Sequence, residues 1–131
     1  MANVAIERDG VIAVVTLGTG TRANALGTED WLGLGDIFLA LHDDDALGAV
    51  IIRGAGDYFS AGSDMREWID AGIEHVDASF AAMERALRAL EVTPGPLVPW
   101  IPRVAAGAGF HLAPACDHAL LAPTCHRPAP A

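Results

Sequence analysis

The sequence predicts an α/β fold in which helices pack against a largely parallel sheet. Two β-rich runs near the start are joined by a tight-turn signal, and later segments with helical periodicity alternate with short apolar runs. Alternation of this kind favours parallel strand pairing in a layered domain. A content of 52% hydrophobic and 19% charged residues is that of a globular chain with a real core.

The chain is expected to open with a β-hairpin. Residues Asn3–Glu7 and Val11–Leu17 are the two strands, separated by Arg8, Asp9 and Gly10. An Asp-Gly pair supplies the positive φ angles that a tight hairpin turn requires. A Gly/Thr loop then leads into the first helix.

Thr28 is the expected N-cap of that helix, with Glu29 and Asp30 favourably placed at the positive end of the helix dipole. Three consecutive aspartates, 43–45, indicate that this helix ends at the solvent-exposed surface. The apolar positions recur at helical spacing; they are Trp31, Leu34, Phe38 and Leu41.

The next segments repeat a strand, loop and helix pattern. Ala49–Ile52 is expected to be a strand buried on both faces. A short helix capped by Ser63 or Asp64 would follow, and then a longer one over Ala78–Leu90. The predicted apolar face of the longer helix is Phe80, Met83, Leu87 and Leu90.

After that helix the sequence predicts a strand over 97–104, a helix opening at Gly107 and Gly109, and a strand over 118–121. Pro99 and Pro102 lie in the first of these strands, where a proline removes a ladder donor. Residues 1–122 are expected to form the core domain, and 123–131 an irregular proline-rich tail.

Composition excludes several classes of function. Eight Lys and Arg against 17 Asp and Glu give a net charge of −9, so nucleic acid is not an expected partner. The amino-terminal segment has no signal-peptide pattern, and the apolar stretch 97–115 is interrupted by prolines, Arg103 and His111. We therefore expect a cytoplasmic protein without a membrane span.

Two loop-to-helix junctions stand out, Phe59–Met65 and Val104–Leu112. Glycine lets a ligand approach the main chain closely, and the first N–H groups of a helix have no internal partner. Two such donors aimed at one carbonyl oxygen form an oxyanion hole, in which each donor contributes about 3–4 kcal/mol to stabilising an enolate.

Several short motifs resemble the enoyl-CoA hydratase/isomerase (crotonase) family in order and spacing, over nearly the whole chain. They are Thr16-Leu17, Asn24-Ala25-Leu26, Ala49-Val50-Ile51-Ile52-Arg53-Gly54-Ala55-Gly56, Phe59-Ser60-Ala61-Gly62-Ser63-Asp64, Val104-Ala105-Ala106-Gly107-Ala108-Gly109 and Ala115-Cys116-Asp117. The resemblance implies a spiral of β-β-α units and an acyl-CoA thioester as the ligand, with coenzyme A as part of the substrate and no separate cofactor or metal.

Position by position, the resemblance implies that the backbone N–H groups of Ser63 and Ala108 form the oxyanion hole. It also implies that the coenzyme A moiety lies along a short set of residues near these donors, with His111 as the candidate proton carrier. The set is Ala61, Ser63, Asp64, Met65, Arg66 and Ala108.

The chain departs from the family pattern at its catalytic positions. His111 stands where hydratases carry one glutamate, and Ala131 stands at the position of the other. Hydration needs a general acid and base, so this departure argues against ordinary hydratase activity. The pattern also stops before the family's carboxy-terminal helices, which predicts exposed apolar surface and a truncated or frameshifted copy of a longer enzyme.

Three alternatives remain open at this stage. The chain could be a non-catalytic remnant or interaction module, either self-associating or joined to a full-length family member. The run Gly18–Ala23 fits a loose dinucleotide fingerprint, although a helix starting near Thr28 argues against it. A zinc site could be built from irregularly spaced residues, namely His111, Cys116, His118, Cys125 and His126.

Overall fold

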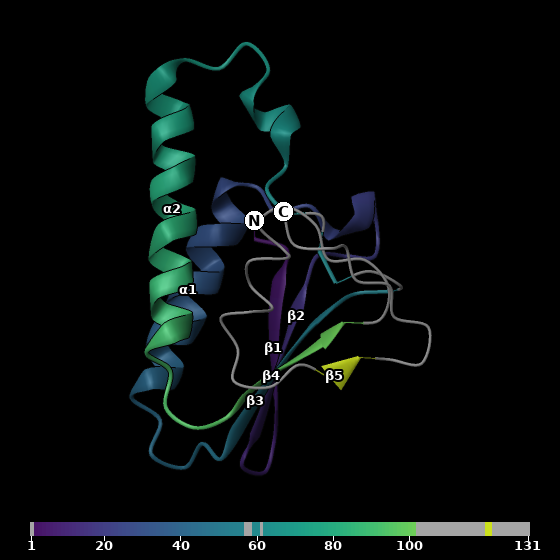
Figure 1. Ribbon diagram of the computed structural model, residues 1–131, viewed down its shortest axis with the longest axis vertical. Coiled ribbons are helices and arrows are strands. Elements are labelled where there is room, and N and C mark those ends of the chain that lie inside the picture. Colours follow the sequence, from purple (N-terminus) through teal and green to yellow (C-terminus); the bar gives the residue numbers. More distant parts are fainter. Residues whose placement is uncertain (1, 57–58, 61, 102–119, 122–131) are drawn as a thin grey trace.

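A computed structural model describes residues 2–56, 59–60, 62–101 and 120–121. The described strands form one sheet in the order β1-β2-β3-β4-β5, antiparallel between β1 and β2 and parallel thereafter. Helices α1 and α2 lie side by side against it (Figure 1). The elements are β1 (Val4–Asp9), β2 (Ile12–Leu17), the 3-10 turn η1 (Arg22–Asn24), α1 (Thr28–His42), β3 (Ala49–Gly54), the 3-10 turn η2 (Met65–Trp68), α2 (Ile73–Glu91), β4 (Leu97–Ile101) and β5 (Leu120–Leu121).

The predicted amino-terminal hairpin is confirmed, with a two-residue loop. Asp9 pairs with Ile12, so Gly10 and Val11 form the turn. Only Gly10 has a positive φ, +60°, at the first loop position, which matches a type II′ turn. The expectation that Asp9 shares the positive φ is wrong, because Asp9 is still extended within β1.

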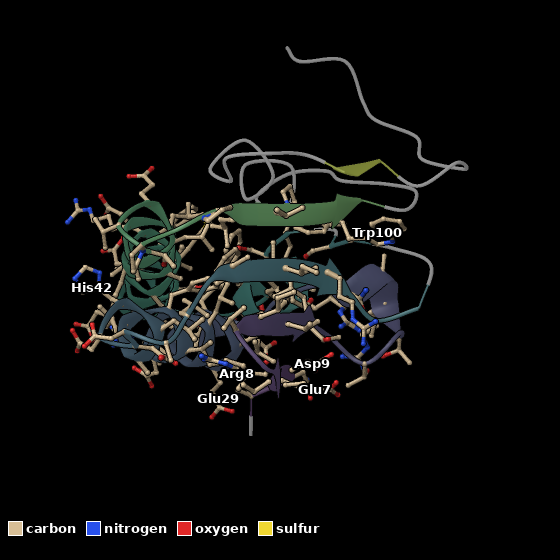
Figure 2. The ribbon with its side chains drawn as sticks, turned by 90° about the horizontal axis from the view of Figure 1, so that it is seen from below. Glu7, Arg8, Asp9, Glu29, His42 and Trp100 are labelled. Atoms are coloured by element: carbon tan, nitrogen blue, oxygen red, sulfur yellow. The ribbon has the colours of Figure 1, made fainter. Side chains whose placement is uncertain are left out.

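One face of the sheet carries the core. Neighbouring strands align Val15 with Ile52, and Ile52 with Pro99, and all three are buried. On the opposite face Ile51 is only half-buried and Arg53 is exposed, so the prediction that this strand is buried on both faces is wrong. Figure 2 shows the helices on one side of the sheet.

Strand β4 forms in spite of Pro99, and the hydrogen-bond pattern explains how. The Val50 N–H donates to the Pro96 carbonyl at 3.0 Å, so the even-numbered residues of β4 face β3. The missing N–H of Pro99 therefore points away from β3. On its other side, the pairing with β5 begins only at Trp100. Neither described ladder needs the donor that Pro99 lacks.

Helix α1 uses the predicted apolar face, and Trp31, Leu34 and Phe38 are fully buried. Its cap differs from expectation. Gly27 is the N-cap, and Thr28 is the first helical residue. Asp30 reaches back and accepts a hydrogen bond from the Gly27 N–H at 2.8 Å. Glycine leaves the cap without a side-chain acceptor, and the Glu67 carboxylate accepts from the Thr28 N–H in its place.

Helix α2 begins at Ile73, five residues before the predicted start, and its buried face is shifted from the predicted one. Of the four predicted core positions, Leu90 is fully buried, Met83 and Leu87 are partly buried against the core, and Phe80 is 48% exposed. The buried side chains are mostly small, since Ala82, Ala86 and Ala89 belong to the core. Small residues let two helices approach closely.

Gly35 on α1 provides the other half of this close approach. A Cβ built there would lie 3.6 Å from the Ala86 Cα, so α1 and α2 are nearly in backbone contact at this point. At the surface, Arg85 on α2 joins the two helices through an ion pair of 2.6 Å with Asp36 on α1. The prediction from periodicity was right only in part, because contact with the partner helix, not the size of the side chains, selects the positions that are fully buried.

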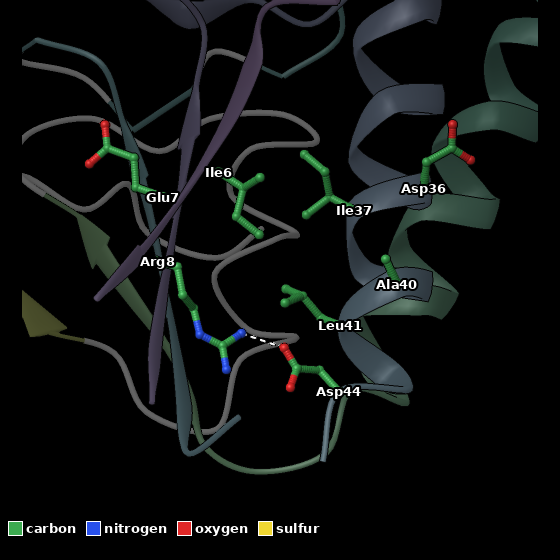
Figure 3. Close-up of a pocket in the computed structure, with 8 residues that line it drawn as sticks. All are labelled: Ile6, Glu7, Arg8, Asp36, Ile37, Ala40, Leu41 and Asp44. Atoms are coloured by element: carbon green, nitrogen blue, oxygen red, sulfur yellow. Dashed lines mark hydrogen bonds and ion pairs between the residues drawn. The ribbon is translucent and has the colours of Figure 1, made fainter. Parts of the chain in front are cut away.

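A cleft of about 450 Å³ lies between the helix-facing side of β1 and α1 (Figure 3). Ile6, Ile37 and Leu41 form its apolar floor, and Arg8 is ion-paired with Asp44 at one end. Glu7 points away from the cleft. Strand β1 is an edge strand with mostly exposed side chains, and charged residues on such a strand disfavour edge-to-edge pairing.

Several predicted elements lie outside the described residues. These are the helix at Gly107 and Gly109 and the tail 123–131, so the division at residue 122 stays a prediction. Of the predicted strand over 118–121, residues 120 and 121 are described as β5. No helix in the described ranges is long and apolar enough to cross a membrane.

The buried face of α1 can be tested with one substitution made at two sites. Leu34→Ala removes a fully buried side chain and should lower the free energy of unfolding by about 2–5 kcal/mol. Leu39→Ala, at a position 43% exposed, should cost less than about 1 kcal/mol. Urea denaturation measures both. Equal losses would show that the helix faces the core differently.

Candidate functional site

The segment after β2 holds three consecutive residues in the left-handed region. Arg22, Ala23 and Asn24 have φ values of 54°, 52° and 56°. This conformation costs a non-glycine residue about 1–2 kcal/mol, and such strain persists only where the surroundings fix it. The turn η1 therefore needs strong local anchoring.

The buried side chain of Asn24 is that anchor. It is 1% exposed, and its Oδ1 accepts a hydrogen bond from the Gly20 N–H at 2.9 Å. Its Nδ2 donates to the Ala55 carbonyl at 2.7 Å, just past β3, and also contacts the Phe59 carbonyl at 3.4 Å. One amide thus joins the ends of β2 and β3 to the loop that follows β3.

Ser60, in the loop after β3, also hydrogen-bonds to Asn24. Its side chain is fully buried, and its Oγ donates to the Asn24 carbonyl at 2.8 Å and accepts from the Gly62 N–H at 3.0 Å. The sequence interpretation included Asn24 and Ser60 in motifs but assigned neither a role. A polar residue inside an otherwise small and apolar loop was the available signal, because buried polar groups need partners.

Leu26 and Ser63 form an isolated parallel β-bridge. The Leu26 N–H donates to the Gly62 carbonyl at 2.7 Å, and the Leu26 carbonyl accepts from the Asp64 N–H at 2.7 Å. In a parallel bridge, the residue lying between the two bonded partners directs its own N–H and C=O to the opposite side. The Ser63 N–H is therefore turned away from the Leu26 segment.

The Ser63 side chain is held from two helices. Its Oγ accepts a hydrogen bond from Trp31 Nε1 on α1 at 3.1 Å and lies 3.8 Å from the Met83 sulfur on α2. These contacts fix the orientation of the residue between the two helices. The hydroxyl is used in these two contacts. The main-chain N–H of Ser63 points away from the Leu26 segment.

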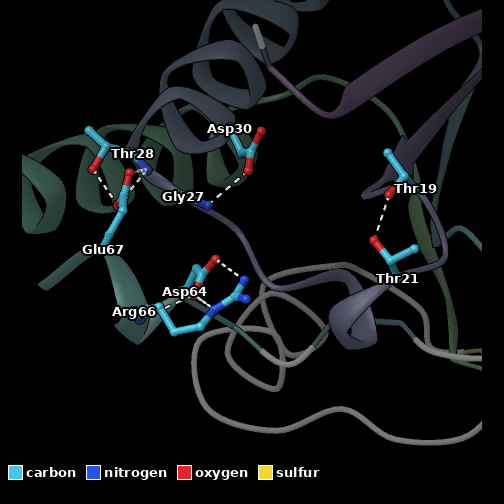
Figure 4. A network of polar contacts seen from close by, with 8 residues as sticks. All are labelled: Thr19, Thr21, Gly27, Thr28, Asp30, Asp64, Arg66 and Glu67. Atoms are coloured by element: carbon cyan, nitrogen blue, oxygen red, sulfur yellow. Dashed lines mark hydrogen bonds and ion pairs between the residues drawn. The ribbon is translucent and has the colours of Figure 1, made fainter. Parts of the chain in front are cut away.

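Asp64 and Arg66 form the charged part of the loop (Figure 4). The guanidinium binds the carboxylate in bidentate fashion, at 2.9 Å and 2.7 Å. This hydrogen bonding by Arg66 holds the pKa of Asp64 below its ordinary value, and the charge of Arg22 acts in the same direction. Asp64 also caps η2 by accepting from the Arg66 N–H at 3.2 Å. The next residue, Met65, is 69% exposed.

Glu67 joins η2 to the start of α1. Its carboxylate accepts hydrogen bonds from the Thr28 N–H, at 3.0 and 3.1 Å, and from the Thr28 hydroxyl at 2.9 Å. It thereby supplies the helix-capping acceptor that Gly27 lacks. A polar cavity of about 380 Å³ opens beside this contact, lined in part by Arg22, Asp30 and Asp64.

The structure brings four of the predicted site residues into one loop, namely Ser63, Asp64, Met65 and Arg66. The other three, Ala61, Ala108 and His111, lie outside the described residues. The possible zinc ligands between His111 and His126 lie there too. Among the described residues, no group of three or more His, Cys, Asp or Glu side chains could hold a metal ion.

The dinucleotide fingerprint at Gly18–Ala23 has the wrong structural context. It leads into the left-handed turn η1, and α1 begins only at Thr28. A phosphate-binding fingerprint needs a helix that opens within the motif. The sequence expectation that this match is fortuitous is therefore supported.

Comparison with known proteins places this loop in a family. The family model described as Enoyl-CoA hydratase/isomerase matches residues 7–126. The chain belongs to the enoyl-CoA hydratase/isomerase family. It is 30% identical over 121 residues to a probable enoyl-CoA hydratase of Mycobacterium bovis, and 34% identical over 114 residues to a carnitinyl-CoA dehydratase of Escherichia coli K12. Those matches cover 92% and 86% of this chain.

The fold of this family member is crotonase-like, as the sequence predicted. An enoyl-CoA hydratase/carnithine racemase structure from Magnetospirillum magneticum superposes with a TM-score of 0.88 at 34% identity, covering 97% of this chain and 49% of that one. The two curated relatives are matched over 46% and 42% of their length. The chain thus spans about half the length of the relatives it matches.

The anchoring role of Asn24 can be tested by comparing alanine substitutions at two glycines. Gly18 and Gly10 both have positive φ, +77° and +60°. A Cβ at Gly18 would collide with the Asn24 side chain, whereas a Cβ at Gly10 meets nothing within 4 Å. Gly10→Ala should cost only the φ penalty of about 1–2 kcal/mol.

Gly18→Ala should cost at least about 1 kcal/mol more than Gly10→Ala, because displacing Asn24 also breaks its hydrogen bonds. Thermal or urea unfolding of the two variants measures the difference. Equal destabilisation would mean that Asn24 does not fix the turn.

The ion pair between Asp64 and Arg66 gives a pH prediction. The pKa of Asp64 is lowered in the folded state, so its stabilising effect is present above the ordinary value of 3.8 and is lost as pH falls through the folded value. Asp64→Asn should therefore shrink the drop in Tm between pH 7 and pH 3 by about 2–4 °C, after allowing for solvent screening of the half-exposed Arg66. Arg66→Gln should have the same effect, and an unchanged drop in both variants would contradict this assignment.

Proposed function

We propose that this chain binds an acyl-CoA thioester and holds its carbonyl oxygen at the Ser63 N–H, in an oxyanion hole completed by the N–H of Ala108. The observation that carries the proposal is the parallel bridge between Leu26 and Ser63. It uses the Gly62 carbonyl and the Asp64 N–H, and it leaves the Ser63 N–H directed away from the Leu26 segment. A fixed amide of this kind stabilises developing negative charge without reorganisation.

The local charges support a coenzyme A moiety near the same loop. The chain carries a net charge of −9, yet Arg22 lines the cavity beside Asp64, and Arg66 is paired with Asp64 next to Ser63. Coenzyme A is a polyanion, and arginine is well suited to phosphate recognition. The exposed Met65 between the two charged residues offers an apolar surface to the rest of the moiety.

Catalytic turnover would also need residues that donate and accept protons. His111 stands at the position of one family glutamate and is our candidate proton carrier, while Ala131 stands at the position of the other. An alanine can neither donate nor accept a proton. This substitution favours a second candidate function, a non-catalytic acyl-CoA-binding or interaction module that acts alone or beside a full-length family member.

Binding can be tested with two ligands that differ in one oxygen. Crotonyl-CoA is compared with its but-2-enyl thioether, which lacks the carbonyl, by isothermal titration. The carbonyl should improve affinity by about fivefold or more, since a hydrogen bond to a fixed amide contributes about 1 kcal/mol. Equal affinities, or no heat and no ligand-induced melting shift, would contradict the proposal.

Ser63→Ala is the matched protein variant. It keeps the backbone N–H, so the preference for the carbonyl should remain within about threefold of the wild-type value. The variant should nevertheless be less stable by about 1–3 kcal/mol, because the buried Trp31 Nε1 loses its acceptor. A hydration assay on the same samples separates the two candidate functions, since binding without hydration identifies the non-catalytic module.

A further inference from the structure

Strand β1 lies at one end of the described sheet, so one of its long edges has no partner strand. The Gly18 N–H donates to the Asn3 carbonyl at 2.7 Å, so the odd-numbered residues of this strand direct their backbone groups toward β2. The N–H and C=O groups of Val4, Ile6 and Arg8 therefore point away from the sheet. No hydrogen bond within the described part of the chain reaches these outward groups.

The free edge of β1 adjoins the cleft between β1 and α1. Ile6 pairs with the buried Val15, so its side chain lies on the helix-facing side of the sheet, where it lines the cleft. Ile37 and Leu41 continue this apolar surface onto α1 (Figure 3). Residues directly opposite each other in an antiparallel pair share one face of the sheet. A strand added antiparallel to β1 would therefore direct alternate side chains into this cleft of about 450 Å³.

The opposite side of β1 carries uncompensated negative charge. Glu7 and Asp9 are exposed, and Glu7 points away from the cleft (Figure 3). Neither carboxylate forms an ion pair with another residue that the structure describes. Arg8 is the one cation of the strand, and it is already ion-paired with Asp44. The whole chain also has a net charge of −9, so this edge is electrostatically complementary to a basic partner.

The same charges disfavour a second copy of this chain as the occupant of the edge. Antiparallel pairing of two β1 strands would bring Glu7 and Asp9 of both chains onto one face, where like charges repel. A basic segment would place opposite charges on that face instead. The charge pattern therefore favours a segment of another protein.

We propose that the free edge of β1 and the adjoining cleft bind an extended segment of a partner protein in which apolar and basic residues alternate. The segment pairs antiparallel with β1, its apolar side chains enter the cleft beside Ile6, and its basic side chains lie on the face of Glu7 and Asp9. In recognition by strand addition, main-chain hydrogen bonds supply affinity and alternate side chains supply specificity. None of the residues that line the cleft belongs to the Ser63 loop, so the inference is independent of acyl-CoA binding.

The first test uses a capped peptide in which lysine and valine alternate, titrated into the full chain by calorimetry. It should bind with a Kd of about 100 µM or tighter. Replacing every lysine by glutamate should weaken binding about tenfold or more.

Backbone methylation of the same peptide tests the strand pairing itself. In antiparallel pairing, the cleft-facing residues are the ones that donate to β1. Methylating the valine amides should therefore abolish binding, whereas methylating the lysine amides should change the Kd by less than about threefold. Equal losses for the two methylated peptides would overturn the proposed pairing.

The second test changes the protein at exposed positions. Ala40 lines the cleft from α1, so Ala40→Phe should obstruct it and weaken binding of the lysine–valine peptide about tenfold or more. Ala81→Phe, at an exposed position of α2 outside the cleft, is the matched control and should keep the wild-type affinity. Glu7→Gln removes only a surface charge and should weaken binding about threefold. Wild-type affinity in both Ala40→Phe and Glu7→Gln would contradict the proposal.

Hydrogen exchange locates the bound peptide. The amides of Val4, Ile6 and Arg8 should be protected about tenfold or more on binding, because they gain acceptors. The odd-numbered amides of β1, which already face β2, should change little. Protection confined to other parts of the chain would overturn the proposed site.

Two further outcomes would also overturn the inference. One is the absence of saturable peptide binding up to about 1 mM. The other is a dimer, detected by sedimentation, that Ala40→Phe dissociates, since a second copy would then occupy the edge. Crotonyl-CoA should bind Ala40→Phe and wild-type protein equally. A failure of peptide docking therefore leaves the acyl-CoA proposal standing, and a failure of acyl-CoA binding leaves the docking site standing.

Discussion

The buried amide of Asn24 is the constraint on which the rest of the described site depends. Three residues of η1 adopt positive φ, at a cost of about 1–2 kcal/mol each. The hydrogen bonds of Asn24 and Ser60 offset this strain, because a fully satisfied buried network is strong in a low-dielectric interior. The same bonds set the distance between the ends of β2 and β3 and the loop that follows.

The orientation of Ser63 follows from this anchoring. Once η1 is fixed, Leu26 lies beside the loop and forms the parallel bridge that turns the Ser63 N–H away from the Leu26 segment. Trp31 holds the Ser63 hydroxyl from α1, and Glu67 ties η2 back to the start of the same helix. The candidate donor is therefore fixed by several elements, as preorganised electrostatic stabilisation requires.

The sequence predicted well those elements whose signals are local. The hairpin, α1 and its apolar face, and the short turn capped by Asp64 were all expected, because turn chemistry and helical spacing act over a few residues. The start of α2 was missed although Ile73 and Val76 continue the helical spacing back from Phe80, since the N-cap is Gly72, which has no side chain to signal a cap. The predicted face of α2 was right only in part, because Gly35 on α1 favours small partners and the fully buried positions are mostly alanines.

The sequence by itself determined the family, the order of the strands and helices, and the loop that holds Ser63, because ordered motifs and short-range periodicity are written along the chain. Only the tertiary structure decided which way the Ser63 N–H points, that Asn24 anchors the turn, and that Trp31 holds the Ser63 hydroxyl. These features depend on contacts between residues far apart in sequence, and hydrogen bonds form only where distance and direction are both satisfied.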